Sequence, residues 1–215
     1  IRDVSTEHFL GKLLPSAVLS HNCDPTLLLD LNALPSDLER VKKQLAEHGI
    51  DGTRPIIGIM GDDNIGALIR RIFGREYPVV AVYSNTKYAD YFLNDLRPLE
   101  WARVFSLFSV TFTRYFHGTI LSLKNGTPTV TLDPWKMEDA EHITKIKDLY
   151  NRLDLNEHYF LRKTSYSEED VQAVSAAARH FLAEPDREKI AAALEREAGS
   201  YESFREAFGA WVQEA

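Results

Sequence analysis

The stretch LFSVTFTRYFHGTILSLKNGTPTVTLD, residues 107–133, has the order strand, turn, helix, strand. The apolar run at 107–112 predicts a buried strand, and the β-rich run at 128–132 predicts a second one. Between them, residues 119–125 carry an apolar helical face that Gly126 brings to an end. Two strands joined through one helix predict a β-α-β unit with a parallel pair of strands.

His117 falls at the turn where the first of these strands passes into the helix. We expect Gly118 to let the backbone turn tightly and Thr119 to help cap the helix. A helix N-terminus has N–H donors and a partial positive charge, so it can hold a carboxylate or a phosphate. A histidine placed there can move protons near neutral pH. The stretch therefore points to chemistry on a small anionic ligand, with a buried structural histidine as the alternative.

The neighbouring sequence repeats the same alternation of strands and helices. Near-continuous apolar strands at 55–60 and 78–83 flank a helical pattern at 65–73, and a capped helix is expected over 167–182. Other helices are expected over 6–14, 35–48, 86–93, 99–105, 139–153, 186–198 and 201–213, with strands at 18–22 and 159–161. This pattern predicts an α/β fold, a Rossmann-like parallel sheet with helices on both faces, followed by C-terminal helices.

The composition is that of an ordinary globular protein with an acidic balance. The 215 residues are 44% hydrophobic and 27% charged, with a net charge of −7 and a pI near 5.5. No basic face is evident, which argues against nucleic-acid binding. Cys23 stands alone, so no internal disulfide forms, and we expect it to be a small buried residue in a reducing compartment. No apolar run is long enough for a transmembrane segment, so we expect a cytoplasmic location, with peripheral membrane attachment as an alternative.

The glycine-rich segment at 58–66 does not fit a nucleotide-binding loop. Its spacing differs from G-x-G-x-x-G, and Asp62 and Asp63 would repel phosphate. We expect a strand-turn-helix in which Asp63 or Asn64 caps the helix, at the same edge of the sheet as His117. No spacing of Cys, His and Asp suggests a metal site, and none is expected.

Four segments together resemble the polysaccharide pyruvyl transferase family over about residues 1–160. They are Arg2-Asp3 followed by Ser5-Thr6, the Asp-Pro-Thr segment within 23–29, the His-Gly-Thr stretch of 113–133, and the Lys-Ile helix of 145–155. Many family members have an arginine two residues before the histidine. Here Tyr115 takes that place and Arg114 precedes it, while Tyr-Phe-His-Gly is closer to a second family version with Ser-Phe-His-Gly.

The resemblance implies transfer of a pyruvyl group from phosphoenolpyruvate to two sugar hydroxyls as a ketal, in polysaccharide or cell-surface glycan biosynthesis. It implies His117 as the catalytic acid or base and a glycan or lipid-linked sugar as the acceptor. Phosphoenolpyruvate is the donor substrate, and no separate cofactor is expected. The expected substrate-binding residues are Arg2, Arg114, Tyr115, Phe116, Gly118 and Thr119.

The resemblance also implies a two-domain architecture of the GT-B type, of which this chain would be the C-terminal part. We expect a leading segment at 1–52, a Rossmann-like donor-binding domain at 53–185 and a helical appendage at 186–215. Because the chain begins with Ile1, we expect a missing N-terminal domain that carries the acceptor site. The isolated chain should then fold but lack transferase activity.

Two other functions remain open from the residues. A sugar-nucleotide glycosyltransferase could use the same GT-B architecture. A non-catalytic interaction module could dock a partner through an apolar face of the last helix, formed by Phe204, Phe208 and Trp211. Binding of phosphoenolpyruvate rather than nucleotide sugars would separate the first two.

Overall fold

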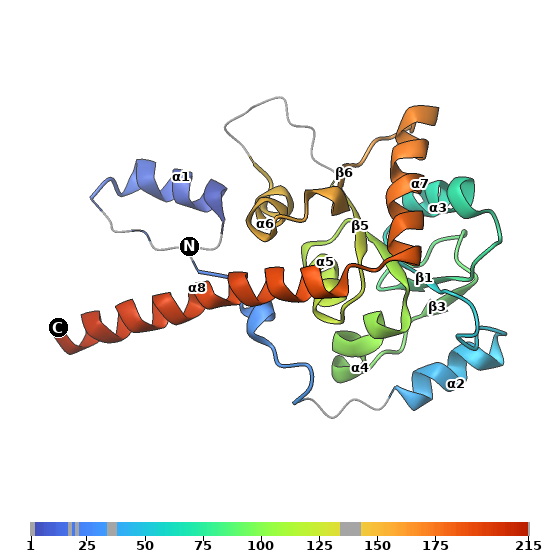
Figure 1. Ribbon diagram of the computed structural model, residues 1–215, viewed down its shortest axis with the longest axis horizontal. Coiled ribbons are helices and arrows are strands. Elements are labelled where there is room, and N and C mark those ends of the chain that lie inside the picture. The colour runs from blue at the N-terminus through green and yellow to red at the C-terminus, as the bar shows by residue number, and fades with distance from the viewer. Residues whose placement is uncertain (1–2, 17–18, 20–21, 34–37, 134–142, 215) are drawn as a thin grey trace.

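A parallel sheet forms the centre of the protein (Figure 1). The computed structural model describes residues 3–16, 19, 22–33, 38–133 and 143–214. Within these ranges six strands lie in the order β3-β2-β1-β4-β5-β6, and every neighbouring pair runs parallel. The strands are β1 (Ile57–Met60), β2 (Val79–Val82), β3 (Tyr91–Leu93), β4 (Val110–Thr113), β5 (Thr129–Asp133) and β6 (Tyr159–Leu161). The expected α/β fold with a parallel sheet is confirmed.

Helices cover both faces of this sheet. The α-helices are α1 (Val4–Leu13), α2 (Glu39–Glu47), α3 (Asp63–Phe73), α4 (Pro98–Arg103), α5 (Phe116–Lys124), α6 (Lys145–Leu153), α7 (Glu168–Ala183) and α8 (Arg187–Glu214). Short 3-10 helices are η1 (Pro25–Leu28), η2 (Val104–Leu107) and η3 (Asn156–His158). Helices α3 and α7 pack with the strand residues Ile57, Ile59 and Phe112, while Met60 and Val80 pack on the opposite side with α2 and η2. This alternation follows from the period of two along a strand.

Two helix expectations were wrong. The helix expected over 86–93 is absent: residues 86–90 are not helical, and residues 91–93 form the edge strand β3, because Tyr, Phe and Leu fit a pleated edge beside β2. The break expected at Gly199 is absent: α8 continues through this glycine and spans Arg187–Glu214. One glycine costs a helix only about 1 kcal/mol relative to alanine, which a long helix tolerates. The first part of α8 packs on α5 and α6, and its other end projects beyond the sheet (Figure 1).

Other boundaries moved by a few residues. The strand expected at 107–112 begins at Val110, because residues 104–107 form η2, whose Phe105 is buried against Phe108. Periodicity alone cannot separate a short buried strand from a buried helical turn. The expected strand at 18–22 falls mostly on residues outside those described, as do the first residues of the helices expected over 35–48 and 139–153.

A buried hydroxyl network fixes α5 and α6 on the sheet. The Tyr150 hydroxyl on α6 lies 2.6 Å from Oγ1 of both Thr129 and Thr131, and Thr131 Oγ1 lies 3.1 Å from Thr119 Oγ1 on α5. Burial raises the pKa of Tyr150 to about 12, so its hydroxyl stays neutral. Each of these hydroxyls is satisfied inside the protein, which makes the relative placement of the two helices specific.

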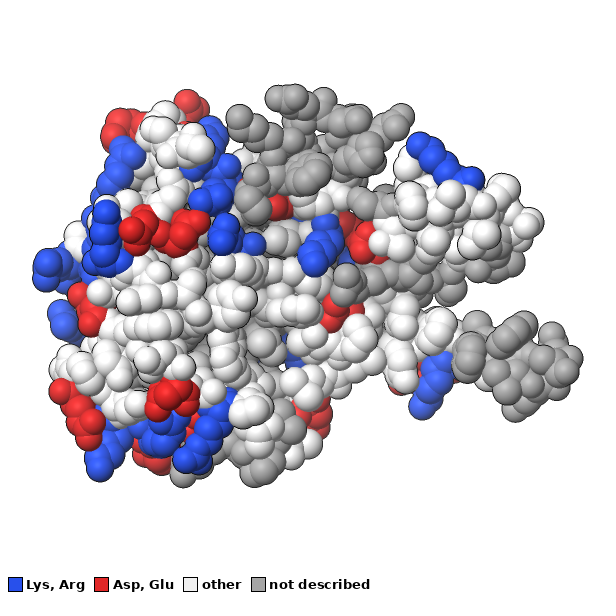
Figure 2. Space-filling model, turned by 180° about the vertical axis from the view of Figure 1, so that it is seen from behind, with Lys and Arg blue, Asp and Glu red and all other residues white. Residues whose placement is uncertain are grey.

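Charges of both signs are interspersed on the face seen in Figure 2.

No helix within the described ranges has both the length and the apolar composition needed to cross a bilayer.

Candidate functional site at the carboxyl end of the sheet

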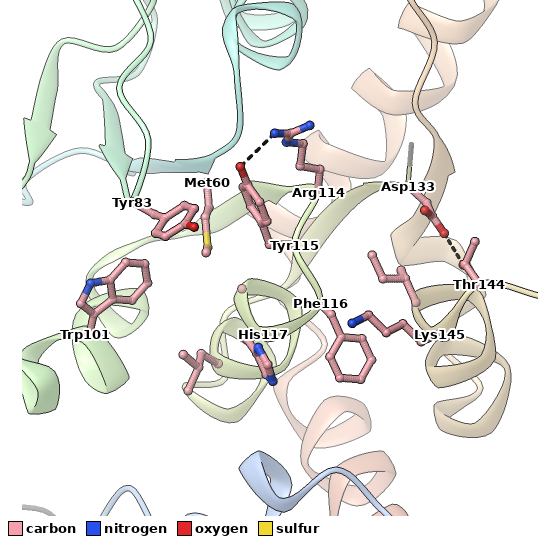
Figure 3. A pocket seen from close by; sticks show the side chains of 13 residues that line it. Met60, Tyr83, Trp101, Arg114, Tyr115, Phe116, His117, Asp133, Thr144 and Lys145 are labelled. Atoms are coloured by element: carbon pink, nitrogen blue, oxygen red, sulfur yellow. Dashed lines mark hydrogen bonds between the residues drawn. The ribbon is translucent and has the colours of Figure 1, made fainter. Parts of the chain in front are cut away.

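A cavity of about 680 Å³ lies where the strand order reverses, at the carboxyl ends of β1 and β4 (Figure 3). Ligands of open α/β sheets bind in the crevice at this kind of position. Met60 and Gly118 line it, with His117, Lys145 and Asp133 as polar residues. Tyr83, Trp101 and Tyr115 form a further part of the wall, which we call the aromatic wall.

Helix α5 begins one residue before His117, and Gly118 sits inside its first turn. The N-cap is Tyr115, whose N–H donates to Thr113 Oγ1 at 3.1 Å. A Cβ on Gly118 would lie 2.5 Å from Met60 Sδ and 2.7 Å from Thr113 Oγ1. Glycine is therefore required for a close approach of α5 to β1 and β4. The tight turn expected at this residue is wrong, because the backbone there is helical.

Thr119 anchors the helix rather than capping it. Its side chain is completely buried, its N–H donates to the Tyr115 carbonyl at 2.9 Å, and its Oγ1 donates to the same carbonyl at 3.2 Å. Because the Thr119 N–H already has an acceptor, the first-turn N–H groups of His117 and Gly118 are the better candidates for holding an anion.

His117 projects into the cavity from the first turn of α5. Its side chain is 59% exposed, and its Nε2 lies 3.9 Å from Oδ2 of Asp24. Asp24 is only 3% exposed and caps η1 by accepting the Thr26 N–H at 3.0 Å. The separation is longer than a hydrogen bond but short enough for attraction once the imidazole is protonated. The Asp-Pro-Thr segment and the His-Gly-Thr turn, far apart in sequence, therefore meet at this site.

Lys145 also lines the cavity, and it was not among the expected site residues. It is the first residue of α6, and its Nζ lies 5.1 Å from the centre of the Phe116 ring, on the same side of the cavity as His117 (Figure 3). The helix was expected to start at 139, which put Lys145 in its middle. The observed start at Lys145, capped by Thr144, places its amine at the cavity instead. The Lys-Ile segment quoted for the family resemblance was the one signal that could have found it.

Asp133 ends β5 and holds the start of α6 in place. It is 2% exposed, and its carboxylate accepts the hydroxyls of Thr144 and, at 3.3 Å, Tyr159. Burial, followed by the charge of Asp133, raises the pKa of Tyr159 well above its ordinary value, so Tyr159 remains a donor. Through Thr144, Asp133 positions the neighbouring Lys145.

Arg114 points away from His117 (Figure 3). Its Nη2 donates to the Tyr115 hydroxyl at 3.0 Å, and its Nη1 lies 3.7 Å from Asp62 Oδ2. Asp62 also binds Arg162 at 2.6 Å and caps α3 through the N–H of Asn64, so the expected capping by Asp63 or Asn64 is wrong. A substrate role for Arg114 stays a prediction, and its place is at the rim of the cavity.

Other residues singled out from the sequence lie outside the cavity or outside the described residues. Arg2 lies outside the described residues, and so do the side chains of Phe208 and Trp211, while Phe204 is half-buried. Cys23 is buried as expected, and burial raises the pKa of its thiol. Within the described ranges, no three His, Cys, Asp or Glu side chains are grouped so as to hold a metal ion.

Taken together, the cavity presents an exposed imidazole, an ammonium group and a helix N-terminus. The last two can hold a small anion, and the imidazole can give or accept a proton beside it.

The family model for polysaccharide pyruvyl transferase matches residues 1–135. No curated protein matches the chain. A solved structure titled "Crystal Structure Analysis of the Glycotransferase of kitacinnamycin" is similar with a TM-score of 0.44 and 12% identity, over 71% of this chain. The aligned part spans 42% of the length of that structure.

Proposed function

Because this chain belongs to the polysaccharide pyruvyl transferase family, we propose that its cavity binds phosphoenolpyruvate and transfers the pyruvyl group to a sugar. The observation that supports this most is the exposed His117 imidazole at the start of α5, with the Lys145 amine on the same side of the cavity. The donor carries a phosphate and a carboxylate, which need positive partners. Lys145 and the first-turn N–H groups of α5 are our candidates, together with Arg2 from the family resemblance.

The reaction requires proton transfers that an imidazole can carry out. A proton adds to the methylene carbon of the donor while a sugar hydroxyl attacks the neighbouring carbon and loses its proton. A second hydroxyl then attacks the same carbon and the bond to the phosphate oxygen breaks, so that phosphate leaves and takes up the proton that the second hydroxyl loses. The product is a cyclic ketal, and no cofactor beyond the donor is needed. His117 delivers or accepts one of these protons, with the Asp24 carboxylate 3.9 Å from its Nε2.

The wider setting is part of the same proposal. Residues 53–185 bind the donor, with residues 1–52 leading into this unit and residues 186–215 appended to it. Glycan biosynthesis in the cytoplasm would supply a glycan or lipid-linked sugar as acceptor, and a further domain of the GT-B type would complete the enzyme.

Calorimetry tests donor binding to the 215-residue chain. We expect phosphoenolpyruvate to bind and UDP-glucose and GDP-mannose not to bind. The variant Lys145→Ala should weaken phosphoenolpyruvate binding by about tenfold or more, because a charge-assisted contact is lost. Lys147→Ala is the matched control, since Lys147 is on the same helix but its amine bonds Asn156 outside the cavity. Binding of the nucleotide sugars alone would favour a glycosyltransferase and contradict the proposal.

A further inference from the structure

Three aromatic rings from different parts of the chain form the aromatic wall of the cavity. Tyr83 follows β2, Trp101 lies on α4, and Tyr115 caps α5. The Tyr83 ring centre lies 5.2 Å from that of Tyr115 and 6.1 Å from that of Trp101, with edge-to-face angles of 76° and 70°. In Figure 3 these rings occupy the side of the cavity away from Lys145, with Met60 between Tyr83 and Tyr115.

Tyr83 is held in this position by a strained backbone. Its φ of 70° is in the left-handed region, and the Ser84 N–H donates to the Val82 carbonyl at 2.9 Å across it. This is a three-residue turn of the less favourable hand, which bulky residues rarely adopt. Burial does not compensate for the strain, because Tyr83 is 62% exposed. Strain of this kind at a cavity is a sign of function, here the presentation of an exposed ring.

The ring faces of this wall do not suit the proposed donor. Phosphoenolpyruvate is small and carries charge on both its ends, so its partners are cations and N–H groups. A cavity of about 680 Å³ is also in the range that accommodates a drug-sized molecule, much larger than a three-carbon phosphate. The aromatic wall therefore faces space that a second, less charged ligand can fill.

We propose that the aromatic wall binds a pyranose ring of the acceptor, with hydroxyls directed toward His117. A pyranose has a C–H face without charge and a rim of hydroxyls, which suits tyrosine and tryptophan, whose rings are apolar and whose tips are polar. This inference rests on the proposed function and extends it, because it places part of the acceptor site on this chain. The expectation from the family resemblance was that another domain carries that site.

NMR titrations of the 215-residue chain test this inference. The probes are methyl β-D-glucopyranoside, methyl β-D-galactopyranoside and methyl β-D-mannopyranoside, which carry no aromatic group of their own. We expect at least one of them to shift the indole N–H signal of Trp101, assigned with Trp101→Phe, and to receive saturation from the protein. The variant Tyr83→Gly should weaken this binding by about tenfold or more. Its melting temperature should be unchanged or higher, since glycine adopts the positive φ without strain.

The control variant is Tyr88→Ala, which removes a half-buried tyrosine outside the cavity and should leave sugar binding unchanged. Absence of binding by all three sugars, or equal binding by Tyr83→Gly, would overturn the inference. Displacement of the Trp101 signal by UMP alone would overturn it as well, because the wall would then stack a nucleobase. Binding of phosphoenolpyruvate is measured separately by calorimetry. If it fails while a sugar binds the wall, the donor proposal falls and the sugar subsite stands.

Discussion

The His117 imidazole combines exposure to the cavity with a buried carboxylate, Asp24, at 3.9 Å. A structural histidine would instead resemble His158. This side chain is fully buried, and its Nδ1 forms a hydrogen bond with the backbone of Thr129. The two residues show that burial, rather than residue type, separates a candidate catalyst from a core histidine in this fold.

His117→Ala in the active enzyme should lower turnover of phosphoenolpyruvate by about 10²–10⁴-fold, the usual contribution of a general acid or base. Stability should change little, because the side chain is largely exposed. Phosphate release in the presence of acceptor measures turnover, and thermal unfolding measures stability. His180→Ala is the control, since His180 is similarly exposed and lies 3.5 Å from Asp186. Wild-type turnover in His117→Ala would remove the catalytic role.

The sequence predicted the place of His117 at the start of a helix, but not the contacts that its neighbours make. Gly118 and Thr119 were assigned to a turn and a cap, whereas contacts with Met60 and Thr131 decide their roles. Those contacts join different strands and helices, so they cannot be read from the pattern of residues along the chain. Tyr83 gave no signal either, because a positive φ at a tyrosine depends on the surrounding fold.

At the scale of elements, the repeated alternation of strand and helix was sufficient to predict the β-α-β unit and the parallel sheet. The failures occurred where patterns were short or ambiguous. Three residues of β3 could not be distinguished from a helical turn, and η2 resembled the start of β4. Lys145 was missed for a related reason, since its role depends on where α6 begins.

Buried His158, which joins η3 to β5, makes the stability of the folded protein depend on pH. Its Nδ1 lies 2.9 Å from the Thr129 carbonyl oxygen, and its ring is stacked on Phe181 with centres 4.2 Å apart. Burial lowers the pKa of His158 in the folded state, opposed by its bond to Thr129 and by the charge of Glu157. Below about pH 6.5 the unfolded chain binds a proton that the folded chain resists. Stability should therefore fall as the pH drops below that value, until the folded-state pKa is passed.

Urea unfolding at pH 7, 6 and 5 measures this dependence. For His158 alone, the loss should be at most about 1.4 kcal/mol per pH unit between the two pKa values. His158→Phe keeps a ring beside Phe181 and should flatten this part of the curve, even though it loses the bond to Thr129. His180→Ala removes an exposed histidine and serves as the control. Equal slopes in the wild type and His158→Phe would show that other groups cause the acid sensitivity.

At the scale of the whole molecule, the fold brings segments that are distant in sequence to one edge of the sheet. Asp24 caps η1, which packs on α5, while Lys145 arrives from α6 and Trp101 from α4. The cavity consequently has a charged side beside His117 and an aromatic side around Tyr83 (Figure 3). This division suits a small anionic donor and a sugar ring bound side by side, which is what pyruvyl transfer requires.

The most direct test is a crystal structure of the 215-residue chain with phosphoenolpyruvate bound. We predict density for the donor in the cavity, with its phosphate or carboxylate within hydrogen-bond distance of the first-turn N–H groups of α5 and of Lys145. The methylene carbon should lie on the side of His117. Donor density at another place on the protein, or a bound donor that contacts neither α5 nor His117, would contradict the account.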